Sequence, residues 1–132
     1  MFPTIELPPG GVSLQWVYNR VRDHLLKQGC RAIEAGMCRY RGPNDTACAA
    51  GCLIRDDKYS PDLENHSVTF EPKVWEAISQ SLNLKLGDNI NPSNEKLLQD
   101  GVIALQAIHD HDDIRSWPDN LRRFAARHDL VP

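Results

Sequence analysis

The sequence lacks every short motif that marks the common nucleotide-binding, zinc-protease and hydrolase classes. It contains no G-x-x-x-x-G-K-[ST], G-x-G-x-x-G, H-E-x-x-H or G-x-S-x-G pattern. No apolar run approaches the roughly 18 residues of a membrane-spanning helix. The first residues do not join a basic segment to an apolar one, as a secretory signal does. These absences predict a cytoplasmic protein outside those enzyme classes, with no membrane contact.

Repeats and low-complexity tracts are also missing, which favours one compact domain. A length of 132 residues suits a single domain. A chain of that size buries roughly two-thirds of the surface that it exposes when unfolded. Hydrophobic residues make up 41% and charged residues 25%, both ordinary for globular proteins. We therefore expect a hydrophobic core that needs neither metal nor disulfides, and no cofactor.

Charge of one sign is not in excess, since the formal net charge is only −3. Residues 1–42 nevertheless hold six basic and three acidic side chains, so the surface is bipolar. We interpret this as solvated faces that steer a partner. In the stretch CRYR, Tyr40 between Arg39 and Arg41 is a pattern that can stack a base and meet phosphate. A single tyrosine in an acidic chain is weak support, and we expect no nucleic-acid binding.

Four amphipathic segments predict four main helices. The first begins after Ser13 as N-cap and ends at Gly29, and the second begins at Pro72. The third helix runs from about Ser93 to His109. The stretch Ser116-Trp117-Pro118-Asp119 resembles a capping box and begins the fourth helix. The residues expected to face inward on the third helix are Leu97, Leu98, Val102, Leu105 and Ile108. Gly101, in the middle of this helix, predicts close packing.

Between the first two helices, turn residues predict one or two short hairpins within residues 30–48. Gly42-Pro43-Asn44-Asp45 suits a type I turn. The small residues of 48–54 predict a short helix that another element approaches closely. Because no βαβ alternation is present, we expect an α+β fold: one α-rich domain over 13–132, in which the helices pack with a small β-hairpin, after an irregular arm over 1–12. Apolar residues expected to hold this arm are Phe2, Ile5 and Leu7.

The four cysteines leave three alternatives open. The favoured one is that Cys38, Cys48 and Cys52 are buried, inert thiols that pack the hairpin against the helices. The second is a zinc site made of Cys38, Cys48, Cys52 and His66. The third is a thiol-dependent enzyme with Cys48 as nucleophile, activated by one of the histidines. Whether Cys30 pairs with another cysteine stays open.

The run HDHDD, residues 109–113, is rich in metal-ligating side chains. In a helix, however, His109 and His111 point about 200° apart and cannot chelate one ion together. We interpret the run as a helix C-terminus and a solvated turn.

Three motifs carry a resemblance to small uncharacterised proteins of bacteriophages and prophages. They are the C-x-Y-R-x-P hairpin at 38–43, the C-A-x-G-x-L-I element at 48–54, and the acidic pair Asp56-Asp57 followed by Tyr59. The resemblance implies a non-enzymatic inhibitor of a host bacterial protein or defence complex, such as an anti-CRISPR-like protein. We expect a monomer or homodimer.

The residues that we expect to contact such a partner lie on the hairpin and on the acidic loop. Arginine and tyrosine are enriched at binding hot spots, which favours the CRYR stretch. The predicted partner-binding residues are Arg39, Tyr40, Arg41, Asp56 and Asp57.

Overall fold

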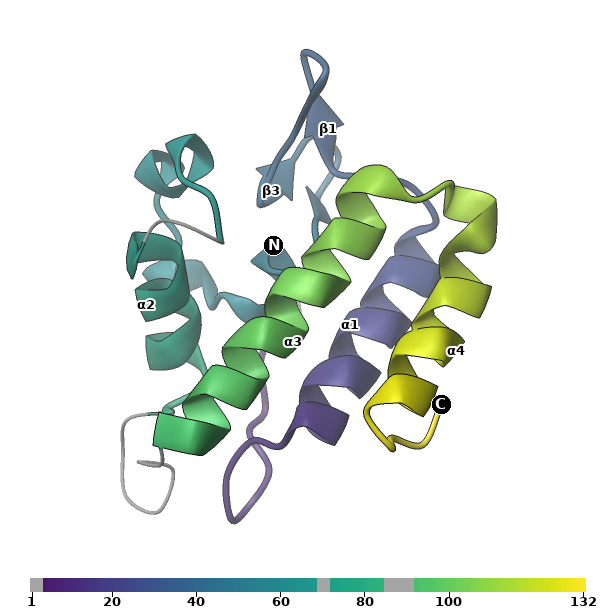
Figure 1. Ribbon diagram of the computed structural model, residues 1–132. Helices are drawn as coiled ribbons and strands as arrows, with labels where there is room; N and C mark the ends of the chain where they lie inside the picture. The colour runs from purple at the N-terminus through teal and green to yellow at the C-terminus, as the bar shows by residue number, and fades with distance from the viewer. Residues whose placement is uncertain (1–3, 69–71, 85–91) are drawn as a thin grey trace.

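The computed structural model describes residues 4–68, 72–84 and 92–132, and it confirms an α-rich α+β fold (Figure 1). The helices are α1 (Leu14–Gln28), α2 (Pro72–Ser81), α3 (Pro92–His111) and α4 (Trp117–Arg127). The strands form two separate antiparallel hairpins, β1 (Ile33–Glu34) with β2 (Met37–Cys38) and β3 (Arg41–Gly42) with β4 (Thr46–Ala47). Short 3-10 helices complete the described elements: η1 (Gly51–Leu53), η2 (Asp56–Lys58), η3 (Pro61–Asn65) and η5 (Ile114–Ser116).

The caps predicted for α1 are confirmed. The Ser13 hydroxyl accepts a hydrogen bond of 3.1 Å from the backbone N–H of Trp16. Gly29 takes φ +67°, and its N–H donates to Leu25 O at 2.9 Å, which ends the helix. The Ser60 hydroxyl caps η3 in the same way by accepting a hydrogen bond from Asp62 N.

Helix α4 begins differently from the prediction. Ser116 makes no side-chain cap hydrogen bond, so the expected capping box is wrong. The turn η5 comes directly before α4, and the Asp113 carboxylate caps that turn by accepting from Arg115 N. Ser116 is already in the helical region of the backbone, which leaves its hydroxyl out of reach of the first-turn amides.

The core lies where α1, α3 and α4 pack side by side (Figure 1). Tyr18 of α1 stacks on Phe124 of α4 with ring centroids 5.8 Å apart. Leu98 and Leu105 of α3 are fully buried beside them, as predicted, but Leu97 is 47% exposed. The prediction that Leu97 faces inward is therefore wrong, and the other four predicted residues of α3 are buried. Helix α2 joins this core through Val74 and Ile78 of its buried face, and Leu82, just after the helix, is buried with them.

Both hairpins lie beyond the C-terminal ends of α1 and α3, and β1 and β2 project farthest from the helices (Figure 1). In the turn between β3 and β4, Asn44 and Asp45 take φ +60° and +58°. Positive φ at both central residues is typical of type I′, so the predicted type I turn is wrong. The mirror-image turn matches the right-handed twist of paired strands, which a type I turn would splay.

The described residues of the N-terminal arm, 4–12, contain no helix or strand. Ile5 and Leu7 are half-buried and pack against the core. Phe2 lies outside the described residues. Within the described ranges, no helix combines the length and apolar character that a bilayer crossing requires.

Two glycines permit close approach between elements. A Cβ on Gly51, in η1, would lie 2.0 Å from Tyr40 O, so this backbone contact tolerates no side chain. A Cβ on Gly101 would lie 2.6 Å from Leu14 Cδ1, the end of a flexible side chain. Close packing at both sites follows the prediction, although 48–54 forms only a 3-10 turn.

These two contacts predict different costs for the same substitution. We expect Gly51→Ala to lower the free energy of unfolding by about 3 kcal/mol or more, because backbone must move to admit the methyl group. For Gly101→Ala we expect a change within about 1 kcal/mol, since better helix propensity offsets the displaced Leu14 side chain. Urea denaturation of both variants measures the difference. Equal costs would contradict the close contact at Gly51.

Candidate functional site

The base of the hairpins is held by one buried carboxylate, that of Glu64 in η3. Its oxygens accept hydrogen bonds from Tyr40 N at 2.9 Å, Arg41 N at 3.0 Å and the Tyr59 hydroxyl at 2.6 Å. The Glu64 side chain is 6% exposed, and Arg39 Nε lies 3.6 Å from its Oε1. A carboxylate that receives two backbone amides and a hydroxyl stabilises the segment between β2 and β3.

The structure places Tyr40 and Arg41 largely inside the protein. Tyr40 is buried, and its hydroxyl donates to His66 O at 2.6 Å. The Arg41 side chain is 13% exposed; it donates to Ile54 O at 2.6 Å and stacks 5.0 Å over the Tyr59 ring. Both residues of the predicted partner surface therefore have internal partners.

The other residues of that predicted surface are more open to solvent. Arg39 keeps a third of its side chain exposed beside Glu64. Asp56 pairs with Arg41 at 2.7 Å and is half exposed, and Asp57 pairs with Arg55 at 3.0 Å. The structure thus brings Arg41 and Asp56 together as an ion pair, whereas Asp57 is exposed and pairs with Arg55 instead.

Cys48 and Cys52 are buried thiols with local hydrogen bonds. Gly51 N donates to Cys48 Sγ at 3.3 Å, and Cys52 Sγ donates to Ala49 O at 3.1 Å. Burial raises the pKa of Cys48 well above its usual range and that of Cys52 to about 12, which is the opposite of what a nucleophile needs. All four cysteines are free thiols.

The alternative zinc set of Cys38, Cys48, Cys52 and His66 does not form one group among the described residues. Among the described residues, the metal-ligating side chains that gather within 4.8 Å of one another are Cys38, His109 and Asp110. Cys48, Cys52 and His66 are not part of this group, because the two buried thiols turn toward their own backbone.

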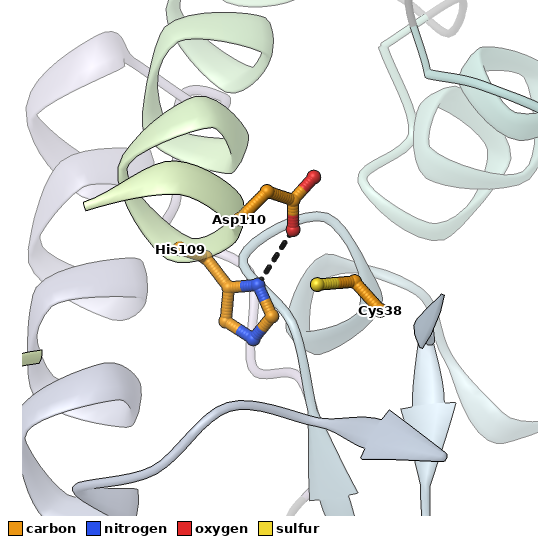
Figure 2. A group of neighbouring side chains, drawn as sticks. All are labelled: Cys38, His109 and Asp110. Carbon is orange, nitrogen blue, oxygen red and sulfur yellow. Dashed lines mark hydrogen bonds and ion pairs between the residues drawn. The ribbon is translucent and has the colours of Figure 1, made fainter. Parts of the chain in front are cut away.

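The Cys38–His109–Asp110 cluster joins β2 to the last turn of α3 (Figure 2). His109 is fully buried, and the prediction of a solvated turn is wrong for this residue. Its ring stacks on Trp117 at 5.6 Å, and Nε2 accepts from Ala32 N at 3.1 Å. Nδ1 therefore carries the proton, which it donates to Asp110 Oδ1 at 2.7 Å.

Asp110 stands between the imidazole and the Cys38 thiol. Burial opposes its ionisation, but hydrogen bonds from His109, Cys38 and Gln106 prevail and hold the pKa of the carboxyl below its usual value. Cys38 is exposed, so the prediction of a buried thiol is wrong for this residue. Partial desolvation of its sulfur and the negative charge of Asp110 raise its pKa to about 11. Since the carboxylate, rather than the imidazole, faces the thiol, the order of groups differs from a cysteine–histidine–aspartate triad, in which histidine takes the thiol proton.

A cavity of about 330 Å³ opens beside this cluster, between the hairpin base, η3 and α3. Its polar lining includes Cys38, Asp110, His66, His111 and Glu64. Sequence reasoning missed Glu64, His109 and Asp110 as partners of the hairpin. The HDHDD run was the available signal, but nothing local indicates which of its residues turns inward.

At the far end of the hairpin, apolar side chains face solvent. Met37 is 69% exposed and Ile33 is 44% exposed. Ile33 pairs with Cys38 and Glu34 with Met37, so the two pairs lie on opposite faces of the ribbon. The face with Cys38 turns toward α3, and the face with Met37 is directed away from it.

The contacts of Glu64 predict a large effect from a small change. We expect Glu64→Gln to lower the free energy of unfolding by about 3 kcal/mol, because the new amide group places a donor against a backbone N–H and removes a buried charge. Asp57→Asn is the matched control, and its exposed ion pair predicts a change below about 1 kcal/mol. Chemical denaturation tests both, and similar small effects would show that Glu64 does not hold the hairpins.

The burial of the thiols predicts their order of alkylation. We expect iodoacetamide at neutral pH to modify exposed Cys30 first, and Cys48 and Cys52 only after unfolding, because their thiols are inaccessible and protonated. Peptide mapping by mass spectrometry follows each site. Rapid modification of Cys48 in the folded protein would instead favour the thiol-enzyme interpretation.

Comparisons with protein-family models, curated proteins and solved structures found no match to this chain. The resemblance to phage and prophage proteins therefore stays a prediction from the motifs quoted above. What the cluster, the cavity and the exposed hairpin can do follows from their own chemistry.

Proposed function

We propose that this protein binds and inhibits a host bacterial protein complex, as a non-enzymatic protein of phage or prophage type. The observation that carries the proposal is Met37, which is 69% exposed on one face of the β1–β2 hairpin, while Ile33, 44% exposed, lies on the opposite face. Flexible, polarizable methionine side chains are frequent at protein-binding surfaces.

The hydrogen bonds that hold the β1–β2 hairpin against the rest of the protein support a role in binding. Ala32 and Tyr40, on either side of the hairpin, donate their backbone N–H groups to His109 and Glu64. A surface held in one conformation before binding loses less entropy when it docks, which raises affinity. The partner would then bind Met37 on a hairpin that already has its bound conformation.

Polar residues near the hairpin base suit the rim of such an interface. Arg39 retains exposed surface, and Asp56 and Asp57 are about half exposed in ion pairs with Arg41 and Arg55. Rim charges affect association rate and partner choice more than affinity. Met37 therefore supplies most of the binding energy, and Tyr40 and Arg41 act by shaping the base of the hairpin.

The proposal predicts that one side chain dominates binding. A photo-crosslinking amino acid at position 37 should capture a discrete host protein from bacteria that express this chain, whereas one at Val131, which is 71% exposed, should not. With the captured partner purified, we expect Met37→Asp to weaken binding by about 30-fold, a hot-spot effect of about 2 kcal/mol. Val131→Asp should leave affinity unchanged.

Inhibition has its own readout. Expression of the protein in a bacterium with an active defence system should restore plating of a sensitive phage, and Met37→Asp should reduce this effect while Val131→Asp does not. If both positions crosslink the same proteins, or if neither variant changes binding, the hairpin is not the interface. If a partner binds but plating and partner activity stay unaffected, inhibition is wrong and binding stands.

A further inference from the structure

The Cys38–His109–Asp110 cluster combines the three side-chain types that bind zinc. Thiolate sulfur, imidazole nitrogen and carboxylate oxygen are its usual protein ligands. One ligand atom from each residue lies within 4.8 Å of the other two. Figure 2 shows the Cys38 thiol and the His109 ring lying near the Asp110 carboxylate, the first from the hairpin and the second from α3.

The hydrogen bonds of His109 decide its role. Nε2 accepts from Ala32 N at 3.1 Å, and Nδ1 donates to Asp110 Oδ1 at 2.7 Å. A metal on Nδ1 would require the ring proton on Nε2, where it would point at the Ala32 N–H. His109 is therefore suited to hold the Asp110 carboxylate from behind, as groups of the outer coordination shell hold ligating carboxylates.

The space for an ion lies on the other side of Asp110. The cavity of about 330 Å³ is lined by Cys38 and Asp110, by the buried thiol of Cys48, and also by His66 and His111. Its volume exceeds that of several water molecules, each about 30 Å³. An ion there can keep water ligands while it contacts the thiolate and the carboxylate.

We propose that Cys38 and Asp110 bind a divalent transition-metal ion of the Zn²⁺ class in this cavity, with His109 as the positioning residue for Asp110. The ion replaces the thiol proton of Cys38, which leaves to solvent. His66 or His111 supplies a further nitrogen, and water fills the remaining position. Bound metal would tie β2 to α3 and fix the hairpin more firmly on the helices.

Zn²⁺ and Co²⁺ binding to the full chain tests this site. Native mass spectrometry should find one Zn²⁺ per chain in the wild type and in Cys30→Ser, the matched control for an exposed thiol outside the cluster. Co²⁺ should give a thiolate-to-metal charge-transfer band in both proteins. Cys38→Ser should abolish the band, Asp110→Asn should weaken binding at least about 100-fold, and His109→Gln should weaken it about 10- to 100-fold.

Several results would overturn the proposal. They are the absence of one-to-one binding to the wild type, a charge-transfer band that survives Cys38→Ser, and a band lost equally in Cys30→Ser. Loss of the band in Cys48→Ser alone would assign the ion to the buried thiol instead. Circular dichroism checks the fold of each variant. If Cys38→Ser fails to fold, a band that survives in Cys30→Ser, Cys48→Ser and Cys52→Ser assigns the ion to Cys38 by elimination, and a band lost in any of these three contradicts the proposal.

Discussion

The structure depends on side chains that complete the backbone hydrogen bonding of very short strands. Strands of two residues satisfy few of their own amides, and isolated two-stranded hairpins are only marginally stable in water. Here helices and turns supply the missing acceptors. The backbone N–H groups served in this way are Ala32 by His109, Tyr40 and Arg41 by Glu64, Ala47 by Gln28, and Ala50 by Gln106.

The residues beside the hairpins also donate hydrogen bonds to the end of α3. Arg31 Nε donates to His109 O at 2.9 Å and Arg31 also donates to Asp112 O, which satisfies carbonyls at the end of α3. The Gln106 side chain accepts a hydrogen bond from Ala50 N, directly before η1, and donates one to Asp110. It therefore links the start of η1 to the Cys38–His109–Asp110 cluster. Polar residues near the hairpins are thereby fixed in place, while the Met37 tip stays exposed. This rigid base supports the proposal that the hairpin binds a partner.

The helical framework could be predicted because its signals are local. Ser13 and Gly29 bound α1 through interactions with residues three or four positions away, and the apolar periodicity of α3 is evident within the helix itself. The predictions were wrong at the start of α4 and at one position of the buried face of α3. Asp113 caps a 3-10 turn ahead of Ser116, and Leu97 lies just outside the buried stripe.

The site could not be predicted because its contacts are distant in sequence. His109 meets Ala32 across 77 positions, and Glu64 meets Tyr40 across 24. Nothing in HDHDD distinguishes the buried histidine from the exposed one until Trp117 and the hairpin pack around it. Likewise Tyr40 and Arg41 have the composition of a binding surface, but their side chains are used within the fold.

Native-state hydrogen exchange is the most direct measurement of this dependence. The amides of Ala32, Tyr40, Arg41, Ala47 and Ala50 should exchange as slowly as the buried amides of α3, because each is released only when the helices and hairpins separate. Exchange of these amides at the rate of an unstructured peptide, with α3 still protected, would contradict the claim that side chains hold the hairpins on the helices.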